Sequence, residues 1–218
     1  MHRLPLPRLR HKIKTPLQMA GVKRKRVDVL MIKGSKVVLT PAILGDRKNI
    51  YEWCFHSETT KYHAGADYPN VHIPTFEEFY DDYVDYFFDG SQPHNGRGFM
   101  ILHNEEPVGF ISYSSYHLKS HKAEVDIWMN CEANCGKGFG TDAIISLGDY
   151  LNKTLGICEL IVRPAKKNVN AIKSYKKSGF EEVDMNPSDY LLDEYLPLPR
   201  YESGDYGADE TALLVKRL

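Results

Sequence analysis

The chain has 218 residues, of which 42% are hydrophobic and 26% are charged, and its formal net charge at pH 7 is −1. This length and apolar content predict one well-buried core. No apolar run approaches the roughly 18–20 residues that a membrane-spanning helix needs. The amino end lacks the apolar centre of a secretory signal. The sequence therefore predicts a cytoplasmic protein with no membrane partner.

The first 30 residues differ in charge from the rest of the chain. Residues 1–30 contain nine Lys or Arg and one acid, which gives them a net charge of +8 against −9 for the remainder. We expect a disordered or non-native leader over 1–30, followed by one domain over 31–218. The run MIKGSKVVLTPA is typical of the lead-in to a first strand, so Met31 is an alternative start. A transit peptide or a nucleic-acid patch around 23–26 is also consistent with the charge, but nothing else in the chain supports either.

The predicted elements follow from periodicity and turn signals. In chain order they are a strand at 36–40, helices at 46–56 and 76–88, strands at 99–103, 107–116 and 123–130, a helix ending near 154, a strand at 157–162, a helix at 168–178, and strands at 180–183 and 211–216. Thr75 and Glu78 form a capping box at the start of the second helix. The stretches 61–74 and 90–98 and the acidic segment before 211 are expected to be loops. The order β-α-α-β-β-β-α-β-α-β-β predicts an α/β (α+β) domain. Its mixed central sheet is flanked by helices, and the late crossovers place strands beside parallel neighbours.

The cysteine pattern argues against a metal site. Cys54, Cys131, Cys135 and Cys158 form no CxxC pair, and no His or Cys cluster follows at zinc-binding spacing. We expect reduced thiols.

The stretch CGKGFGTDAI, residues 135–144, lies between a predicted strand and a predicted helix. Amides at a helix start are unpaired, the helix dipole favours negative charge there, and glycines let an anion approach the backbone. Glycines also occur in many ordinary turns. The spacing fits neither the Walker loop nor the dinucleotide fingerprint. The stretch therefore predicts a site for phosphate or pyrophosphate of another kind.

A second motif, NVNAIKSYKKSGF at 168–180, follows about 30 residues later. Together the two motifs resemble the GNAT superfamily of acetyl-CoA-dependent N-acyltransferases, from Lys36 to the end of the chain. Cys135 stands where the family prefers Arg or Gln. The resemblance implies acetyl-CoA as the acyl donor and no metal. Homodimers are common in the family, so a second copy of the chain is among the expected partners.

The resemblance also assigns donor-binding roles. Amides of the loop would bind the CoA pyrophosphate, and the preceding strand and the second motif would contact the pantetheine arm. The residues are Gly136, Lys137, Gly138, Phe139, Gly140 and Thr141 in the loop, Ile127, Trp128, Met129 and Asn130 in the strand, and Asn168. Tyr175 matches the Tyr that protonates the departing thiolate. The alternative for Tyr175 is a core aromatic on the helix face of Ala171 and Ile172.

Transfer to an amine requires a group that removes a proton from the ammonium form. Asp126 is the first candidate, because aminoglycoside 6′-N-acetyltransferases look alike in this strand. Glu124 is the alternative, and strand alternation places both on one face with Trp128. Either acid is also consistent with an ordinary half-exposed strand. No covalent enzyme intermediate is needed, so Cys131 and Cys135 are not expected to act as nucleophiles.

Acidic residues predict the acceptor class. The segment 76–89 is rich in acids and aromatic rings, and residues 181–210 contain ten acids and one base, Arg200. Solvated surface explains any one of these acids, but as a set they predict a negative cleft that attracts cations. The expected substrate-binding residues are Glu78, Asp81, Asp82 and Asp126. An aminoglycoside 6′-amine fits best, and the alternatives are a polyamine or a ribosomal-protein or N-terminal amine. An inactive acetyl-CoA sensor is a further alternative, and the acidic domain argues against nucleic acid.

Overall fold

The computed structural model describes residues 30–63, 70 and 72–218. The predicted leader therefore lies outside the described residues, apart from its last position. The strands are β1 (Ile32–Lys33), β2 (Val38–Pro41), β3 (Gly96–His103), β4 (Glu106–Ser114), β5 (Lys122–Met129), β6 (Glu159–Val162), β7 (Glu181–Glu182) and β8 (Leu214–Arg217). The helices are α1 (Arg47–Phe55), α2 (Thr60–His63), α3 (Phe76–Asp82), α4 (Tyr86–Asp89), α5 (Phe139–Leu155), α6 (Val169–Lys177), α7 (Pro187–Tyr190) and α8 (Pro199–Glu202). Short 3₁₀ turns lie at Leu44–Asp46, Glu132–Asn134 and Asp193–Tyr195.

The strands form one mixed sheet in the order β1-β2-β3-β4-β5-β6-β8-β7. Every neighbouring pair is antiparallel except β5 and β6, which the crossover through α5 makes parallel. The predicted mixed sheet is confirmed. The prediction that each late crossover creates parallel neighbours is wrong for the second one. β8 lies between β6 and β7 and pairs antiparallel with both.

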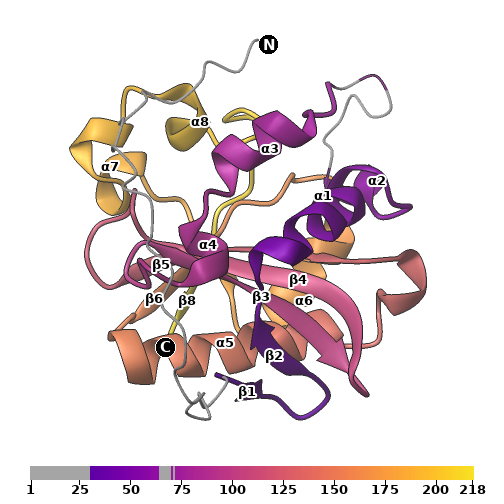
Figure 1. Ribbon diagram of the computed structural model, residues 1–218. Coiled ribbons are helices and arrows are strands. Elements are labelled where there is room, and N and C mark those ends of the chain that lie inside the picture. The colour runs from indigo at the N-terminus through magenta and orange to yellow at the C-terminus, as the bar shows by residue number, and fades with distance from the viewer. Residues whose placement is uncertain (1–29, 64–69, 71) are drawn as a thin grey trace, which may run out of the picture.

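Helices cover both faces of the sheet (Figure 1). On one face, α5 presents Ala143, Ile144, Leu147 and Leu151 to the sheet, and all four are fully buried. Their spacing is that of a helix with a single apolar stripe. On the other face, α1, α3 and α4 cover a second cluster that contains Ile50, Phe79, Phe88 and Phe110. The late segment with α7 and α8 covers a third cluster on β6 and β8.

The long predicted elements are present, with three differences in the helices. Residues 61–63 were expected to lie in a loop but belong to α2. The predicted helix over 76–88 is wrong in its continuity, because α3 ends at Asp82 and the next residue, Tyr83, has a non-helical backbone (φ −112°, ψ 71°). The break allows Tyr83 to stack on Phe79 while α4 restarts in a direction that buries Phe87 and Phe88. The late acidic segment was expected to be a loop but contains α7 and α8. Both begin with proline, which is pre-organised for a first helical turn.

Arg47 of α1 joins the two parts of the helical cover. Its side chain is 6% exposed, and Nη2 lies 2.8 Å from Oδ1 of Asp85. Its guanidinium also lies over the rings of Tyr80, at 4.0 Å, and Phe88, at 4.6 Å. These contacts combine a charge pair with two cation–π interactions. Arg47 therefore fixes α3 and α4 against α1.

We expect Arg47→Met to lower the free energy of unfolding by about 1–3 kcal/mol, because the pair and both ring contacts are lost. The exposed neighbour in Lys48→Met is the control and should change stability by less than about 0.5 kcal/mol. Urea unfolding followed by tryptophan fluorescence measures both. Equal stability of the two variants would contradict this role.

Candidate active site

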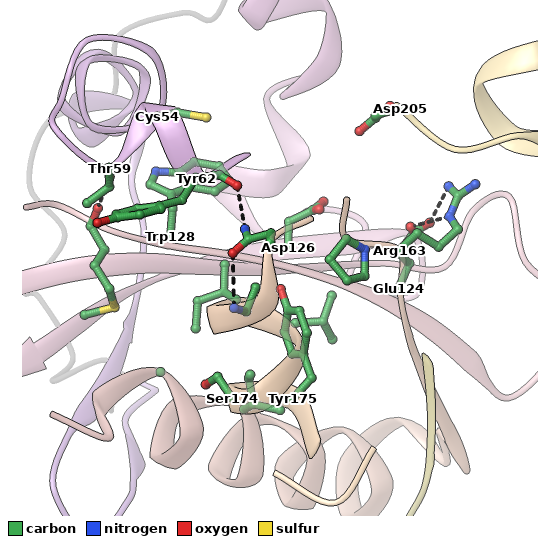
Figure 2. Close-up of a pocket in the computed structure, with 18 of the residues that line it drawn as sticks. Cys54, Thr59, Tyr62, Glu124, Asp126, Trp128, Arg163, Ser174, Tyr175 and Asp205 are labelled. Carbon is green, nitrogen blue, oxygen red and sulfur yellow. Dashed lines mark hydrogen bonds and ion pairs between the residues drawn. The ribbon is translucent and has the colours of Figure 1, made fainter. Parts of the chain in front are cut away.

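The site begins where two parallel strands separate. β5 pairs with β6 only through Lys122–Glu124, although β5 continues to Met129. Within the described part of the chain, residues 125–129 have no ladder partner on the β6 side. A cavity of about 790 Å³ opens there, with a size typical of sites for small molecules. Its walls come from β5, the start of α5, α6, α3 and the late segment (Figure 2).

The glycine stretch forms one end of the cavity. Gly136 and Gly138 have φ of +72° and +82°, a region that glycine enters without strain. Gly138 is the N-cap of α5. Among the described residues, no hydrogen bond uses the amides of 136–141. All loop residues predicted to bind the donor line the cavity except Lys137. The loop therefore presents free amides at a helix start, as an anion site requires.

The predicted strand residues divide in the same way. Ile127, Trp128 and Met129 line the cavity, whereas Asn130 does not. The Asn130 side chain instead donates to the carbonyl of Pro107, at 2.8 Å. Ile127 and Met129 pack toward α5 and α6, and Trp128 packs on the opposite face with Phe110. The predicted alternation along β5 is confirmed.

Asn168 lines the cavity, but its side chain already makes two hydrogen bonds. Oδ1 accepts from the amide of Ala171 at 3.1 Å and caps α6, and Nδ2 donates to the carbonyl of Tyr62 at 2.6 Å. An asparagine amide has two donor hydrogens, so one remains for a ligand. Asn168 thus ties α2 to α6 at the rim of the cavity.

Tyr175 on α6 points its hydroxyl into the cavity below the sheet (Figure 2). The residue is 8% exposed, and its ring packs against Phe180 at 5.8 Å. Burial raises the pKa of Tyr175, and the negative charges of Asp126 and Glu124 raise it further. The hydroxyl is therefore protonated at neutral pH and can donate a proton. The ring of Tyr175 packs as a core aromatic, and its hydroxyl faces the cavity. Packing in the core is therefore compatible with the predicted role as a proton donor.

Asp126 extends from β5 into the cavity, where solvent reaches it although protein atoms surround it on its other sides. The hydroxyl of Tyr83 lies 3.4 Å from Oδ2, at the long limit of a hydrogen bond. Burial is the main cause that raises the pKa of Asp126 to about 7, and the charges of Glu124 and Asp205 add to it. A carboxylate with this pKa can accept a proton near neutral pH.

Glu124, the alternative base, is engaged on both oxygens. Arg163 donates to Oε1 from Nε at 2.7 Å and to Oε2 from Nη2 at 2.9 Å, and Nε2 of His117 lies 2.8 Å from Oε2. Burial opposes ionisation, but the charge of Arg163 and the bond from His117 hold the pKa of Glu124 well below its usual range. This geometry argues against Glu124 as a base. Arg163 also donates to the carbonyl of Tyr201 at 2.6 Å, which fixes the late segment over the site.

The acceptor side of the cavity has fewer of the predicted acids. Asp82 lines it, but Glu78 and Asp81 do not. Glu78 accepts from the amide of Thr75 at 2.7 Å and completes the predicted capping box, and Asp81 is exposed to solvent. Arg200 enters this side and lies 2.6 Å from Asp82 and 3.6 Å from Asp205. We call this side of the cavity the acceptor lobe. Two of its carboxylates, Asp82 and Asp205, therefore lie beside an arginine.

Several cavity residues had no predicted role: His117, Arg163, Arg200, Tyr201, Asp205 and Tyr206. A signal existed for Arg200, which is the one base in the acidic segment 181–210. None existed for Arg163, because its partner Glu124 is 39 residues away and only the pairing of β5 with β6 brings them together, nor for His117, although it lies seven residues from Glu124. All four cysteines are described, and none is in a disulfide. Across the residues that the structure describes, no group of three or more His, Cys, Asp or Glu side chains is arranged to hold a metal. No helix in the same part of the chain is long and apolar enough to cross a membrane.

Comparison with protein-family models identifies the family. The model of the acetyltransferase (GNAT) domain matches residues 36–181. The chain belongs to the GNAT acetyltransferases. It is therefore an N-acetyltransferase, and the predicted resemblance is confirmed.

Solved structures share the fold at low identity. The aminoglycoside acetyltransferase AAC(6')-Ib in complex with ribostamycin and coenzyme A is 18% identical, with a TM-score of 0.60 over 84% of this chain and 94% of that one. RimL, a ribosomal L7/L12 α-N-protein acetyltransferase in complex with coenzyme A, is 15% identical, with a TM-score of 0.62 over 87% and 98%. A GNAT acetyltransferase from Bacillus anthracis is 15% identical, with a TM-score of 0.58 over 86% and 98%.

We expect Glu124→Gln to lower the pKa of Asp126, because the substitution removes the negative charge that contributes most to opposing its ionisation. Carbon NMR of protein labelled at aspartate carboxyls measures the titration, with Asp126→Asn to assign the signal. The control is Glu105→Gln in an exposed turn, which should leave the midpoint near 7. A wild-type midpoint near the ordinary value of about 4 would contradict the environment described for Asp126.

Proposed function

We propose that this GNAT enzyme transfers an acetyl group from acetyl-CoA directly to a primary amine of a small cationic molecule, with Asp126 as the base. The position of Asp126 is the observation that carries the proposal. It is the carboxylate in the strand gap that has a pKa near neutrality, and it lies in the same cavity as the glycine loop and Tyr175.

The residues of the cavity fit acetyl-CoA as donor. The free amides of 136 and 138–141 suit a pyrophosphate at the start of α5. Lys173 and Lys177 lie one turn apart on α6 and also line the cavity, which adds positive charge on that side. The backbone of 125–129, which has no ladder partner on the β6 side in the described part of the chain, suits the amide groups of the pantetheine arm. When bound, acetyl-CoA supplies an activated thioester.

The reaction needs three proton transfers. The acceptor arrives as an ammonium, and Asp126 removes one proton so that the nitrogen can form its bond to the acetyl carbon. As the carbon–sulfur bond breaks, the sulfur receives the hydroxyl proton of Tyr175, and the new amide nitrogen loses its second proton, which restores the Tyr175 hydroxyl through solvent. The raised pKa of Tyr175 keeps that proton in place before the step. Positioning in the cavity supplies much of the remaining acceleration.

An aminoglycoside is the favoured acceptor, and a polyamine is the related alternative. Asp82, Asp126 and Asp205 attract cations, and the rings of Tyr83, Tyr116 and Tyr206 line the same lobe. Aromatic rings and carboxylates together suit amino sugars. The fold likeness to an enzyme solved with ribostamycin supports this choice.

Arg200 supports a second candidate. It neutralises part of the charge of Asp82 and Asp205, so the lobe is less acidic than the sequence predicts. An acceptor that carries a carboxylate near its amine, such as the amino terminus of an acidic peptide, would complement this arginine. The fold likeness to a protein α-amine acetyltransferase agrees with this alternative.

We expect Asp126→Asn to lower kcat/KM by about 10²–10⁴-fold, the usual contribution of a general base. In the wild type, kcat/KM should rise with pH through about 7 and then level, because the base acts only when ionised. Thiol release from acetyl-CoA measures this with kanamycin, spermidine, a lysine-rich peptide and an acidic peptide. The control is Asp81→Asn, the same change at an exposed acid outside the cavity.

Full activity of Asp126→Asn would rule out the base assignment. Tight acetyl-CoA binding by the wild type, without thiol release for any amine, would favour the sensor alternative.

Arg200→Gln separates the two acceptor classes. For a polycation, we expect kcat/KM to rise about 3–10-fold, because Asp82 and Asp205 are released from the arginine. The acidic peptide should instead be acetylated at least about tenfold more slowly. Arg217→Gln changes an exposed arginine on β8 and serves as the control. A loss of activity with kanamycin and spermidine would reject the polycation class.

A further inference from the structure

The turn between β1 and β2 lies outside both sequence motifs and contacts the glycine loop and the first turn of α5. Asp142, in the first turn of α5, accepts hydrogen bonds from three successive amides: Ser35 at 3.0 Å, Lys36 at 2.7 Å and Val37 at 2.9 Å. The hydroxyl of Ser35 donates to the same carboxylate at 2.7 Å. Successive amides around one anion form a nest, which binds negative charge well. The carboxylate therefore fixes this turn to the helix that begins at the glycine loop.

The lowered pKa of Asp142 agrees with this contact. Burial opposes ionisation of the carboxyl, but the hydrogen bonds from Lys36 and Ser35 outweigh burial and lower the pKa. Gly34 shows how close the approach is, because a Cβ built there would lie 2.3 Å from Oδ2 of Asp142 and 2.6 Å from Oγ of Ser146. Any larger residue at 34 would push the turn away from α5.

Lys36 is held at both its backbone and its side chain. Its ammonium donates to the carbonyl of Lys137 at 3.0 Å, and a Cβ built at Gly138 would lie 3.0 Å from the same nitrogen. Its carbonyl accepts from Nδ1 of His103 at 2.8 Å, and the His103 ring packs on Phe139 at a centroid distance of 4.4 Å. The Lys36 side chain thus runs along the glycine loop and binds the carbonyl in its middle.

We propose that Asp142 and Lys36 are positioning residues for donor binding. The hairpin clamp, defined as Ser35, Lys36, Val37 and Asp142, holds the loop in the conformation whose amides are free for a diphosphate. The bond from Lys36 turns the Lys137 carbonyl toward the hairpin, so that its negative end does not face the anion. The inference rests on the proposed binding of acetyl-CoA at this loop.

Flexibility of the loop explains why a clamp is useful. Glycine at 136, 138 and 140 lets an anion approach, but glycine loses more conformational freedom than other residues when it is ordered. A loop that is ordered before binding does not have to meet that cost in the complex. The Lys36 ammonium also adds a positive charge beside the start of α5.

Binding of acetyl-CoA, measured by calorimetry, tests the clamp directly. We expect the Kd to rise about 5–20-fold in Lys36→Met and in Asp142→Asn, the effect of losing one or two hydrogen bonds to charged groups. Lys33→Met is the matched control, since Lys33 is an exposed lysine of the same hairpin, and its Kd should equal that of the wild type.

Steady-state kinetics distinguishes positioning from general damage. With an amine that the wild type acetylates, KM for acetyl-CoA should rise, while kcat, KM for the amine and the thermal midpoint of Lys36→Met stay near wild-type values. Unchanged Kd in both variants would overturn the clamp. A rise accompanied by a parallel fall in kcat and thermal midpoint would also overturn it, because that pattern indicates a damaged fold. Failure of the wild type itself to bind acetyl-CoA would instead reject the proposed donor.

Discussion

The separation of β5 from β6 after Glu124 is the constraint on which the rest of the site depends. Three residue pairs hold the two strands together, and beyond them no further pair joins β5 to β6 in the described part of the chain. A gap within a sheet exposes backbone groups that would otherwise be paired, and such groups need new partners. The same gap lies between α5 and α6, where Tyr175 lies, and the opposite face of β5, which carries Asp126. In the proposed function, donor binding and acceptor chemistry share one cavity because of a single break in strand pairing.

Glu124 and Asp126 lie two residues apart on β5 but have opposite electrostatic environments. Glu124 is buried with Arg163 and His117, which keep it ionised and make it a structural anchor for the late segment. Asp126 has no comparable cation beside it, so burial dominates and raises its pKa to about 7. Pairs of carboxylates with diverging pKa values commonly mark a division between a charged support and a proton acceptor. Because the pKa of Asp126 is higher in the folded state than in the unfolded state, the folded state binds this proton more tightly. The contribution of Asp126 to folding stability therefore falls as the pH rises from about 4 to about 7.

Local sequence patterns predicted the features that depend only on residues close together in the sequence. Alternation placed Asp126 on the face of Trp128, and the glycine spacing located the start of α5. Contacts between distant segments were beyond such patterns. The pairing of Arg163 with Glu124 depends on which strands are neighbours, and the position of β8 between β6 and β7 depends on sheet order. The break at Tyr83 shows the same limit, because tertiary packing overrides a continuous helical pattern.

The number of acids in a sequence segment does not by itself give the electrostatic potential in the cavity that the segment lines. Residues 181–210 contain ten acids, yet in the cavity one arginine of that segment, Arg200, lies beside both Asp82 and Asp205. Glu78 is used as a helix cap, and Asp81 faces solvent. Under the proposed function, the attraction for a cationic acceptor would then come from Asp126 when it is ionised and from the carboxylates beside Arg200. An acceptor with one amine near Asp126 and a second group matched to Arg200 is consistent with this lobe. Selectivity would then come from the arrangement of a few charges and not from a uniformly acidic surface.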